Sequence, residues 1–245
     1  MALNKKVLQL VLQEPVIETY GNFKVVREDL VPGGSKMRFL PYIVDPKAEL
    51  CYGGPFCGGA ALALSELGKR TGQKITLFYA AREKLHPRQH QARANGATLK
   101  FVRPGYMTVV QARAKKYADK KGAELLHLGF DMPTAEDPFV AFMEKVRKKV
   151  GDVPEVWCAA GSGFLTRCLG KAFPKSKVFG VGVGLASRHD AQSYTKNVTI
   201  LESPYDFAQV CKVEAPYNSC PNYDRKAWEM MVELGKKGAL HWNVL

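Results

Sequence analysis

Short apolar runs alternate with amphipathic helical stretches along most of this 245-residue chain, and this alternation constrains the fold more than any other feature. The run "KITLFYA" (74–80) has the length and the β-branched and aromatic content of a strand. The stretch "TVVQARAKKYADKKG" (108–122) has helical spacing and ends at glycine. Strands that alternate with helices of about 10–15 residues form βαβ units. We therefore predict an α/β fold with parallel sheets covered by helices.

The same patterns place the other elements. We expect strands at 23–28, 74–80, 97–102, 123–129, 155–161, 177–184, 198–203 and 239–244, and helices at 58–72, 87–96, 108–122, 137–151, 164–174 and 224–238. No repeat and no linker rich in Pro, Gly and Ser interrupts them, so the connections between domains are expected to be short.

The chain carries a net charge of +13, with basic clusters at 113–121, 145–149 and 171–177. Each run alone is explained by a solvated helix face. The total excess favours a polyanionic partner such as nucleic acid, or anionic substrates, although no nucleic-acid-binding motif is present. The six cysteines form no CxxC pair, which argues against zinc and indicates free, partly buried thiols.

The sequence also bears on the compartment. No apolar run reaches the length of about 20 residues that a membrane span needs. Acidic residues and a proline follow the short apolar stretch at the start, so we expect no signal peptide and a cytoplasmic protein.

Two strand-to-helix turns are rich in glycine: "CYGGPFCGGAA" (51–61) and "CAAGSGFLTR" (158–167). Parallel sheets bind ligands beyond the carboxyl ends of their strands, and a helix start offers N–H groups to an anion. "GSG" at 161–163 is therefore a candidate phosphate cradle. Glycine required only by the geometry of the turn is the alternative, and neither a Walker loop nor a dinucleotide fingerprint is present.

A lysine follows a third glycine-containing turn, in "VPGGSKMRFLPYIV" (31–44). Gly33, Gly34 and Ser35 lead into Lys36 at the start of an expected helix, which Ser35 can cap. An amine on such a turn, combined with a phosphate cradle elsewhere, meets the requirements of pyridoxal phosphate: a lysine for the aldehyde and helix-end amides for the phosphate. A purely structural lysine is the alternative.

"REDLVPGGSKMRFLPYI" (27–43) resembles the lysine segment of the fold-type-II pyridoxal-phosphate enzymes, the tryptophan synthase β-like group. "GGPFCGGAALALSELGKRTGQKITLFY", "LHPRQHQARANGATLKFV", "VWCAAGSGFLTRCLG" and "NYDRKAWEMMVELGKKGALHWNV" are similar to later segments of that family, in the same order. The branch of aminocyclopropane-carboxylate deaminase and D-cysteine desulfhydrase is nearest. The resemblance implies two αβα sheets, with a small domain at 43–133 inserted in a larger one formed by 1–42 and 134–245.

The resemblance also implies a cofactor site. Lys36 falls on the lysine that carries pyridoxal 5′-phosphate and moves protons at the substrate α-carbon. Gly161, Ser162 and Gly163 fall on the phosphate loop, with Phe164 in place of its third glycine and Thr166 as a hydroxyl donor.

Two further positions are implied by the last matched segment. Tyr223 falls on an active-site tyrosine, and half-buried packing is its alternative. Asp224 falls on the residue that faces the pyridine nitrogen. A carboxylate there would keep that nitrogen protonated, whereas a helix N-cap is the alternative.

The substrate loop departs from the family. Where the family has Ser-Asn-His after its glycines, this chain has Phe56, Cys57, Gly58 and Gly59 after Gly54. An apolar loop removes the polar clamp on the substrate carboxylate, and desolvation of that carboxylate favours loss of carbon dioxide.

These departures shape the expected function. We expect a pyridoxal-phosphate-dependent lyase that decarboxylates an amino-acid adduct on a DNA base. Compact members of the resembled family occur in bacteriophages, where they look like parts of pathways that build such adducts on thymine. In that case it would act in the host cytoplasm. The alternatives are a small-molecule deaminase or β-eliminating lyase, and a catalytically inactive relative that binds pyridoxal phosphate or DNA. The family also implies a homodimer.

Overall fold

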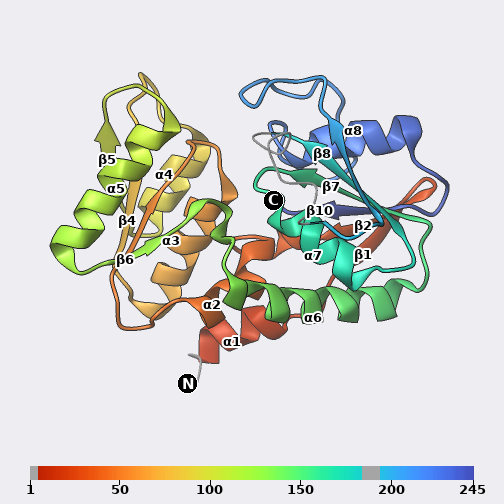
Figure 1. The fold of residues 1–245 in the computed structure, drawn as a ribbon, viewed down its shortest axis with the longest axis horizontal. Coiled ribbons are helices and arrows are strands. Elements are labelled where there is room, and N and C mark those ends of the chain that lie inside the picture. Colours follow the sequence, from red (N-terminus) through yellow and green to blue (C-terminus); the bar gives the residue numbers. More distant parts are fainter. Residues whose placement is uncertain (1–4, 184–193) are drawn as a thin grey trace. The chain divides into compact units, whose positions relative to one another are not determined.

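The computed structural model describes residues 5–183 and 194–245 and divides into two compact units. The first unit comprises Met1–Gln13 and Pro32–Ala135, and the second comprises Glu14–Val31 and Glu136–Leu245. Each unit contains its own sheet and its own helices, drawn in Figure 1.

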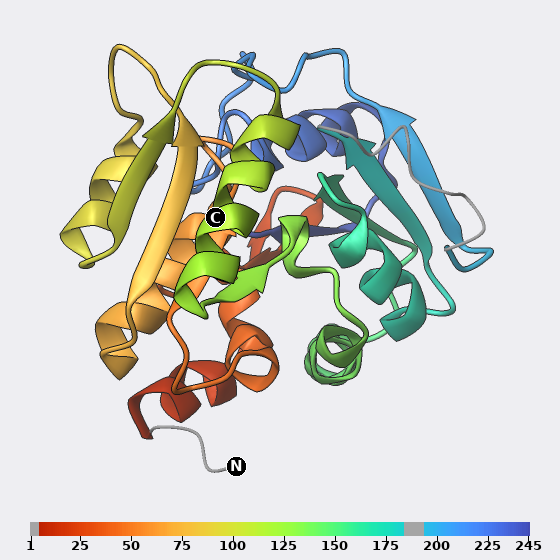
Figure 2. The ribbon, with the colours of Figure 1, turned by 60° about the vertical axis from the view of Figure 1, so that its left-hand side comes forward.

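The first unit is built on a four-stranded sheet in the order β5-β4-β3-β6, and all of its strand pairs are parallel. The strands are β3 (Leu50–Gly53), β4 (Ile75–Ala80), β5 (Thr98–Val102) and β6 (Glu124–Leu126). The helices α3 (Gly59–Thr71) and α4 (Pro87–Ala94) cover one face, and α5 (Met107–Lys121) covers the other (Figure 2). This arrangement follows from right-handed crossovers that first run in one direction along the sheet and then return.

The second unit is built on a six-stranded sheet in the order β1-β2-β10-β7-β8-β9. Only β1 (Ile17–Tyr20) and β2 (Phe23–Arg27) pair antiparallel; β10 (Leu240–Asn243), β7 (Glu155–Ala160), β8 (Lys177–Gly182) and β9 (Val198–Glu202) continue the sheet in parallel. Its helices are α6 (Pro133–Val150), which begins in the first unit, α7 (Phe164–Ala172) and α8 (Asp224–Leu234).

The core of the second unit shows why its central strand β7 is apolar after Glu155. Every residue of β7 is buried, as expected for a parallel strand covered on both faces. Trp157 stacks on Phe179 with ring centroids 4.4 Å apart, and Trp242 packs edge-on against Phe139 and Phe142. This packing holds the strand ends that carry the candidate site.

The prediction of an α/β fold with parallel and mostly parallel sheets is confirmed. Each predicted helix and strand has a counterpart of the same type, although several end earlier than expected. The helix expected at 224–238 ends at Leu234, and the strand expected at 123–129 yields β6 and then the turn η3 (Leu128–Phe130). The chain leaves extended geometry there, with φ of +79° at Gly129 and +60° at Phe130. Gly184, the last residue of the strand expected at 177–184, lies outside the described residues.

Several short elements were not predicted. These are α1 (Lys5–Leu12), β1, β3 and η1 (Glu28–Leu30), while the helix expected at Lys36 is replaced by the turn η2 (Ser35–Arg38) and the short helix α2 (Leu40–Ile43). They are too short for periodicity to identify them.

The bounds of the two units differ from those of the expected domains, which were 1–42 together with 134–245, and 43–133. Residues 32–42 and the N-terminal segment belong to the first unit. The buried Arg38 side chain explains this, because it donates to the carbonyl oxygens of Leu10, Val11 and Gln13 at 3.0, 3.3 and 2.6 Å. These bonds tie the segment after Lys36 to the end of α1.

All six cysteines are free and buried, which confirms the expectation of free thiols. Within the described part of the chain, no helix combines the length and the apolar character that crossing a membrane requires.

Candidate active site

Lys36 lies in a single 3-10 turn of the first unit, η2, rather than at the start of an α-helix. Gly34 precedes it with φ of +72°, which glycine adopts at little cost. The expectation that Ser35 caps a helix is wrong, because Gly34 is at the N-cap and no side chain caps the turn. The Lys36 Nζ atom lies 5.9 Å from the centroid of the Phe130 ring.

Close packing fixes this turn. Met37, Arg38 and Phe39 are buried, whereas Lys36 is partly exposed. Gly33 has φ of +88°, and a Cβ atom there would lie 2.7 Å from Cγ of Met37. The buried neighbours therefore hold the Lys36 backbone while its side chain keeps access to solvent.

The candidate substrate loop connects β3 to α3 in the same unit. Gly58 is the N-cap of α3, and Gly59 is its first residue. The Tyr52 ring lies so close to Gly54 that a larger residue would clash, since a Cβ atom there would lie 2.2 Å from the ring. Phe56 is half-buried and Cys57 is buried, so this loop presents few polar side chains of its own.

Side chains from α4 and from the connection between β4 and α4 contact this loop. The guanidinium carbon of Arg82 lies 3.6 Å from the centroid of the Phe56 ring, and the His86 ring packs edge-on at 5.4 Å. The Arg88 Nη1 atom donates a short hydrogen bond to the carbonyl oxygen of Cys57. Burial, and then the charges of Arg88 and Arg82, lower the pKa of His86.

Sequence reasoning missed these arginines because they lie about 30 residues after the loop that they contact. Their signal was the basic segment beginning "AREKLHPR" (81–88), which parallel pairing of β3 and β4 brings to the same edge of the sheet. The loop is therefore bordered by cations and is not an apolar surface.

The candidate phosphate loop occupies the turn between β7 and α7 in the second unit. Gly163 is the N-cap of α7 with φ of +84°, a conformation that favours glycine. The Phe164 side chain is buried and stacks on Phe139 at 6.0 Å between centroids. The loop therefore presents Gly161, Ser162 and Gly163 at a helix start of the kind that binds anions.

Thr166 lies one turn into α7 and is fully buried. Its hydroxyl lies 3.3 Å from the Sγ atom of Cys158 in β7, and its side chain also fills the space beside Gly180. Burial raises the pKa of the Cys158 thiol to about 12. This hydroxyl thus contacts the sheet, which is not the orientation that the resemblance implies.

Tyr223 contacts the phosphate loop directly. Its hydroxyl oxygen accepts a hydrogen bond from the backbone N–H of Gly161 at 3.0 Å. A Cβ atom at Gly161 would lie 2.6 Å from that oxygen, so glycine is needed there. Burial raises the pKa of Tyr223 well above its usual range, which keeps the phenol protonated.

Asp224 is the first residue of α8 and is completely buried. The alternative that it is the N-cap is not observed, because Tyr223 holds that position. Its carboxylate oxygens accept hydrogen bonds from the backbone N–H groups of Val244 and Leu245 at 3.1 and 3.2 Å. Asp224 therefore joins the start of α8 to the end of the chain.

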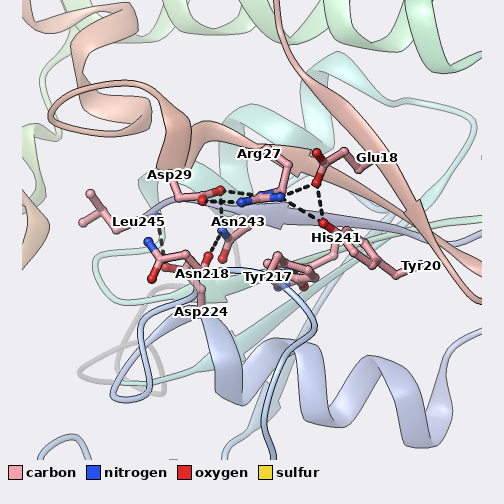
Figure 3. A network of polar contacts seen from close by, with 10 residues as sticks. All are labelled: Glu18, Tyr20, Arg27, Asp29, Tyr217, Asn218, Asp224, His241, Asn243 and Leu245. Carbon is pink, nitrogen blue, oxygen red and sulfur yellow. Dashed lines mark hydrogen bonds and ion pairs between the residues drawn. The ribbon is translucent and has the colours of Figure 1, made fainter.

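A polar network beside Asp224 was not predicted as part of the site (Figure 3). Arg27 makes a bidentate contact with Asp29, with distances of 2.9 and 2.8 Å from Nε and Nη2. It also contacts Glu18 and the Tyr20 hydroxyl. In the sequence, this network is indicated only by the pair Arg27 and Asp29 in "RED" (27–29), at the start of the segment that resembles the family.

The network continues into the last strand. Asn243 donates to Asp29 Oδ1 at 2.7 Å and to the carbonyl oxygen of Asn218 at 2.9 Å. The Tyr217 hydroxyl lies 2.8 Å from Nδ1 of His241. These bonds fix β10 and the loop that leads to Tyr223.

The predicted residues thus form two groups. Lys36 and the loop at 54–59 belong to the first unit, and the loop at 161–166, Tyr223 and Asp224 belong to the second. Within the second unit, the structure brings Tyr223 to Gly161. No cluster of three or more metal-ligating side chains occurs in the described ranges, 5–183 and 194–245.

No family model and no curated protein sequence matches this chain. Solved structures do match. A homologue of ACC deaminase aligns with a TM-score of 0.75 at 15% identity, over 99% of this chain and 95% of that one. A hydrogen sulfide-producing enzyme from Fusobacterium nucleatum gives 0.72 at 13% identity, over 100% and 97%. O-ureido-L-serine synthase gives 0.71 at 14%, over 99% and 92%.

At these identities the likeness concerns the fold. The fold of this chain is that of the fold-type-II enzymes to which the sequence resemblance pointed, and this prediction is confirmed.

Proposed function

We propose that this protein is a pyridoxal-phosphate-dependent lyase that acts at the α-carbon of an amino acid. The observation that carries the proposal is the phosphate loop of the second unit, where a Gly-Ser-Gly turn with Gly163 at φ of +84° opens α7. Its small residues leave room for a phosphate, and the helix dipole favours the anion. Lys36, on its buried and glycine-prepared turn, supplies the amine.

The residues present fit the cofactor in the second unit. Gly161–Gly163 would hold its phosphate, and Asp224 would face its pyridine nitrogen. When bound, pyridoxal phosphate supplies an electron sink for the α-carbon. Tyr223, protonated and hydrogen-bonded to Gly161, would orient the loop and hold a proton near the phosphate. Lys36 would accept the α-proton of the substrate.

The substrate loop bears on which bond breaks. Arg82 and Arg88 place two cations at the loop, although its own side chains are apolar. Cations favour a firmly held substrate carboxylate, and a held carboxylate favours loss of the α-proton. The geometry therefore supports deamination or β-elimination best, and the solved enzymes with this fold include an O-ureido-L-serine synthase and a hydrogen sulfide-producing enzyme.

Decarboxylation of an amino-acid adduct on a DNA base is the second candidate. The net charge of +13 supports a polyanionic carrier, and the replacement of the family's Ser-Asn-His by Phe56 and Cys57 supports a changed substrate. A protein that binds pyridoxal phosphate or DNA but catalyses no reaction would contradict both candidates.

The cofactor is tested by loading the protein with pyridoxal phosphate and recording its visible absorbance and its thermal unfolding. We expect a visible band that disappears in Lys36→Ala and persists in Lys47→Ala, an exposed lysine of the same unit. A band of equal strength in both variants would contradict the role of Lys36.

The reaction is tested on the loaded protein with a panel of free amino acids and with DNA that carries amino-acid adducts. Release of ammonia or sulfide from a free amino acid supports the first candidate. Carbon dioxide release and a mass loss in the digested nucleoside support the second. A loaded protein that turns over neither substrate would contradict both.

A further inference from the structure

The positive charge of this chain is concentrated in one of its two units. The first unit contains 19 Lys and Arg residues against 7 Asp and Glu, a net charge of +12, whereas the second contains 17 against 16, a net charge of +1. Basic helix faces that serve only solubility would divide the excess between two units of similar length. The excess therefore has a local origin in the first unit.

Within that unit, the excess follows α4, β5 and α5. Residues 82–121 contain 11 Lys and Arg residues and only 2 acidic ones. One of these acids, Asp119, is paired with Lys115 at 3.1 Å. The other basic side chains of α5 are exposed. This segment accounts for most of the charge of the unit.

The outer face of α5 arranges these cations in a line. Val110, Ala114 and Ala118 are buried against Cys51 and Phe78 of the sheet. Arg113, Lys116 and Lys120 lie on the opposite side, at intervals of three and four residues that place them along one stripe of a helix. At about 1.5 Å per residue, the three cations extend over roughly 10 Å.

The same face of α5 also has a shallow hollow and an exposed aromatic side chain. Thr108, Val109, Ala112, Arg113 and Lys116 line a shallow hollow. Tyr106, directly before α5, is 85% exposed, and Val109 is 42% exposed. We call Tyr106, Val109, Arg113, Lys116 and Lys120 the α5 basic face. An almost fully exposed tyrosine beside a row of cations is the combination on which unpaired bases stack while phosphates are neutralised.

We propose that the α5 basic face binds single-stranded nucleic acid. The three cations contact successive phosphates, and Tyr106 stacks on a base that is free of a duplex. The hollow between Val109 and Arg113 receives the sugar or the next base. This inference goes beyond the proposed function, because binding at α5 needs neither the cofactor nor Lys36.

The test is fluorescence anisotropy of a labelled oligothymidylate of about 20 nucleotides, titrated with the whole protein at several salt concentrations. The variant is Arg113→Glu, Lys116→Glu and Lys120→Glu. The matched control is Lys145→Glu, Lys148→Glu and Lys175→Glu, which makes the same change of charge at exposed positions of the second unit. Circular dichroism confirms that both variants fold.

We expect the α5 variant to lose about tenfold or more in affinity and the control to change about twofold. The slope of log affinity against log salt should fall by about 2 in the α5 variant, since about 0.7 is lost for each phosphate contact on a single strand. Equal losses in the two variants would overturn the proposal, because they would report net charge and not a site.

A second variant separates nucleic acid from other polyanions. Tyr106→Ala should weaken oligothymidylate binding by about fivefold or more and leave inorganic polyphosphate binding unchanged. An equal effect on both ligands, no effect on either, or tighter binding of a duplex would overturn the single-strand proposal. Failure of this test leaves the visible band of the pyridoxal-loaded protein unaffected, so the two proposals fail independently.

Discussion

The hydroxyl oxygen of Tyr223 lies 3.0 Å from the backbone nitrogen of Gly161, so a side chain at the start of α8 reaches the loop that opens α7. The contact joins two positions that are 62 residues apart in the sequence. It explains why the first residue of the loop is glycine, because a methyl group there would displace the phenol.

This contact predicts a coupling between the two positions. Gly161→Ala should lower the free energy of unfolding by about 1–3 kcal/mol, as overpacking does. In a Tyr223→Phe background the cost should be smaller, because the nearest atom to the new methyl group is then 3.1 Å away and not 2.6 Å. Denaturant unfolding of the four proteins measures the coupling. Additive effects would show that the phenol does not constrain Gly161.

The turn that carries Lys36 should be sensitive to its glycines. Gly33→Ala combines φ of +88° with a methyl group 2.7 Å from Met37, and we expect a loss of about 2–3 kcal/mol in the free energy of unfolding. Gly72→Ala is the control, because Gly72 has φ of +79° in open space. It should cost about 1 kcal/mol. Urea unfolding compares them, and equal losses would exclude a role for the Met37 contact.

The sequence was sufficient to predict the long elements, because each has a periodic pattern over six or more residues or a glycine at its end. The pattern of β7, apolar at every position after Glu155, is typical of a strand buried on both faces. The turn η2 was mistaken for a helix, since four residues carry no periodicity and the burial of Met37 and Arg38 depends on α1 and α3.

Only the part of the candidate site that has a local sequence signal was predictable. Lys36 and the Gly-Ser-Gly loop could be proposed from the sequence because glycine before a functional group leaves a local signal. Arg82 and Arg88 were missed because their role depends on the pairing of β3 with β4, which brings distant residues to one edge. The orientation of Thr166 toward Cys158 was likewise decided by packing within the second unit.

The buried His241 should make stability depend on pH. Burial lowers its pKa from 6.5 to about 3, while the backbone of Asp224 opposes this shift. The folded protein therefore keeps this ring neutral, and stability present above pH 6.5 is lost as the pH falls toward 3, because only the unfolded chain binds the proton. The ring is held by Tyr217, whose own pKa burial raises.

Between pH 6.5 and pH 5 the loss should reach about 1.6 kcal/mol, because the slope rises from about 0.7 kcal/mol per unit of pH at pH 6.5 toward about 1.4 at lower pH. Gln at position 241 can accept the Tyr217 hydrogen bond but does not titrate, so His241→Gln should lose less over the same range. Urea unfolding at several pH values gives both curves. Parallel curves for the two proteins would mean that His241 does not contribute.

Asp224 should have a structural role that is measurable without the cofactor. Its carboxylate accepts hydrogen bonds from the N–H groups of Val244 and Leu245. In Asp224→Asn one oxygen becomes an amide donor that faces an N–H group, and we expect a loss of about 1.5–3 kcal/mol in the free energy of unfolding. Asp206→Asn, at an exposed aspartate of the same unit, should change it by less than about 0.5 kcal/mol.

The same variant also tests the role toward the pyridine nitrogen. A ligand that binds only the folded protein raises its melting temperature in proportion to the logarithm of its concentration over its dissociation constant. If Asp224 faces the pyridine nitrogen, pyridoxal phosphate should stabilise Asp224→Asn less than it stabilises the unaltered protein and Asp206→Asn. Thermal unfolding with and without the cofactor measures this difference. An equal shift in all three proteins would assign Asp224 to the end of the chain alone.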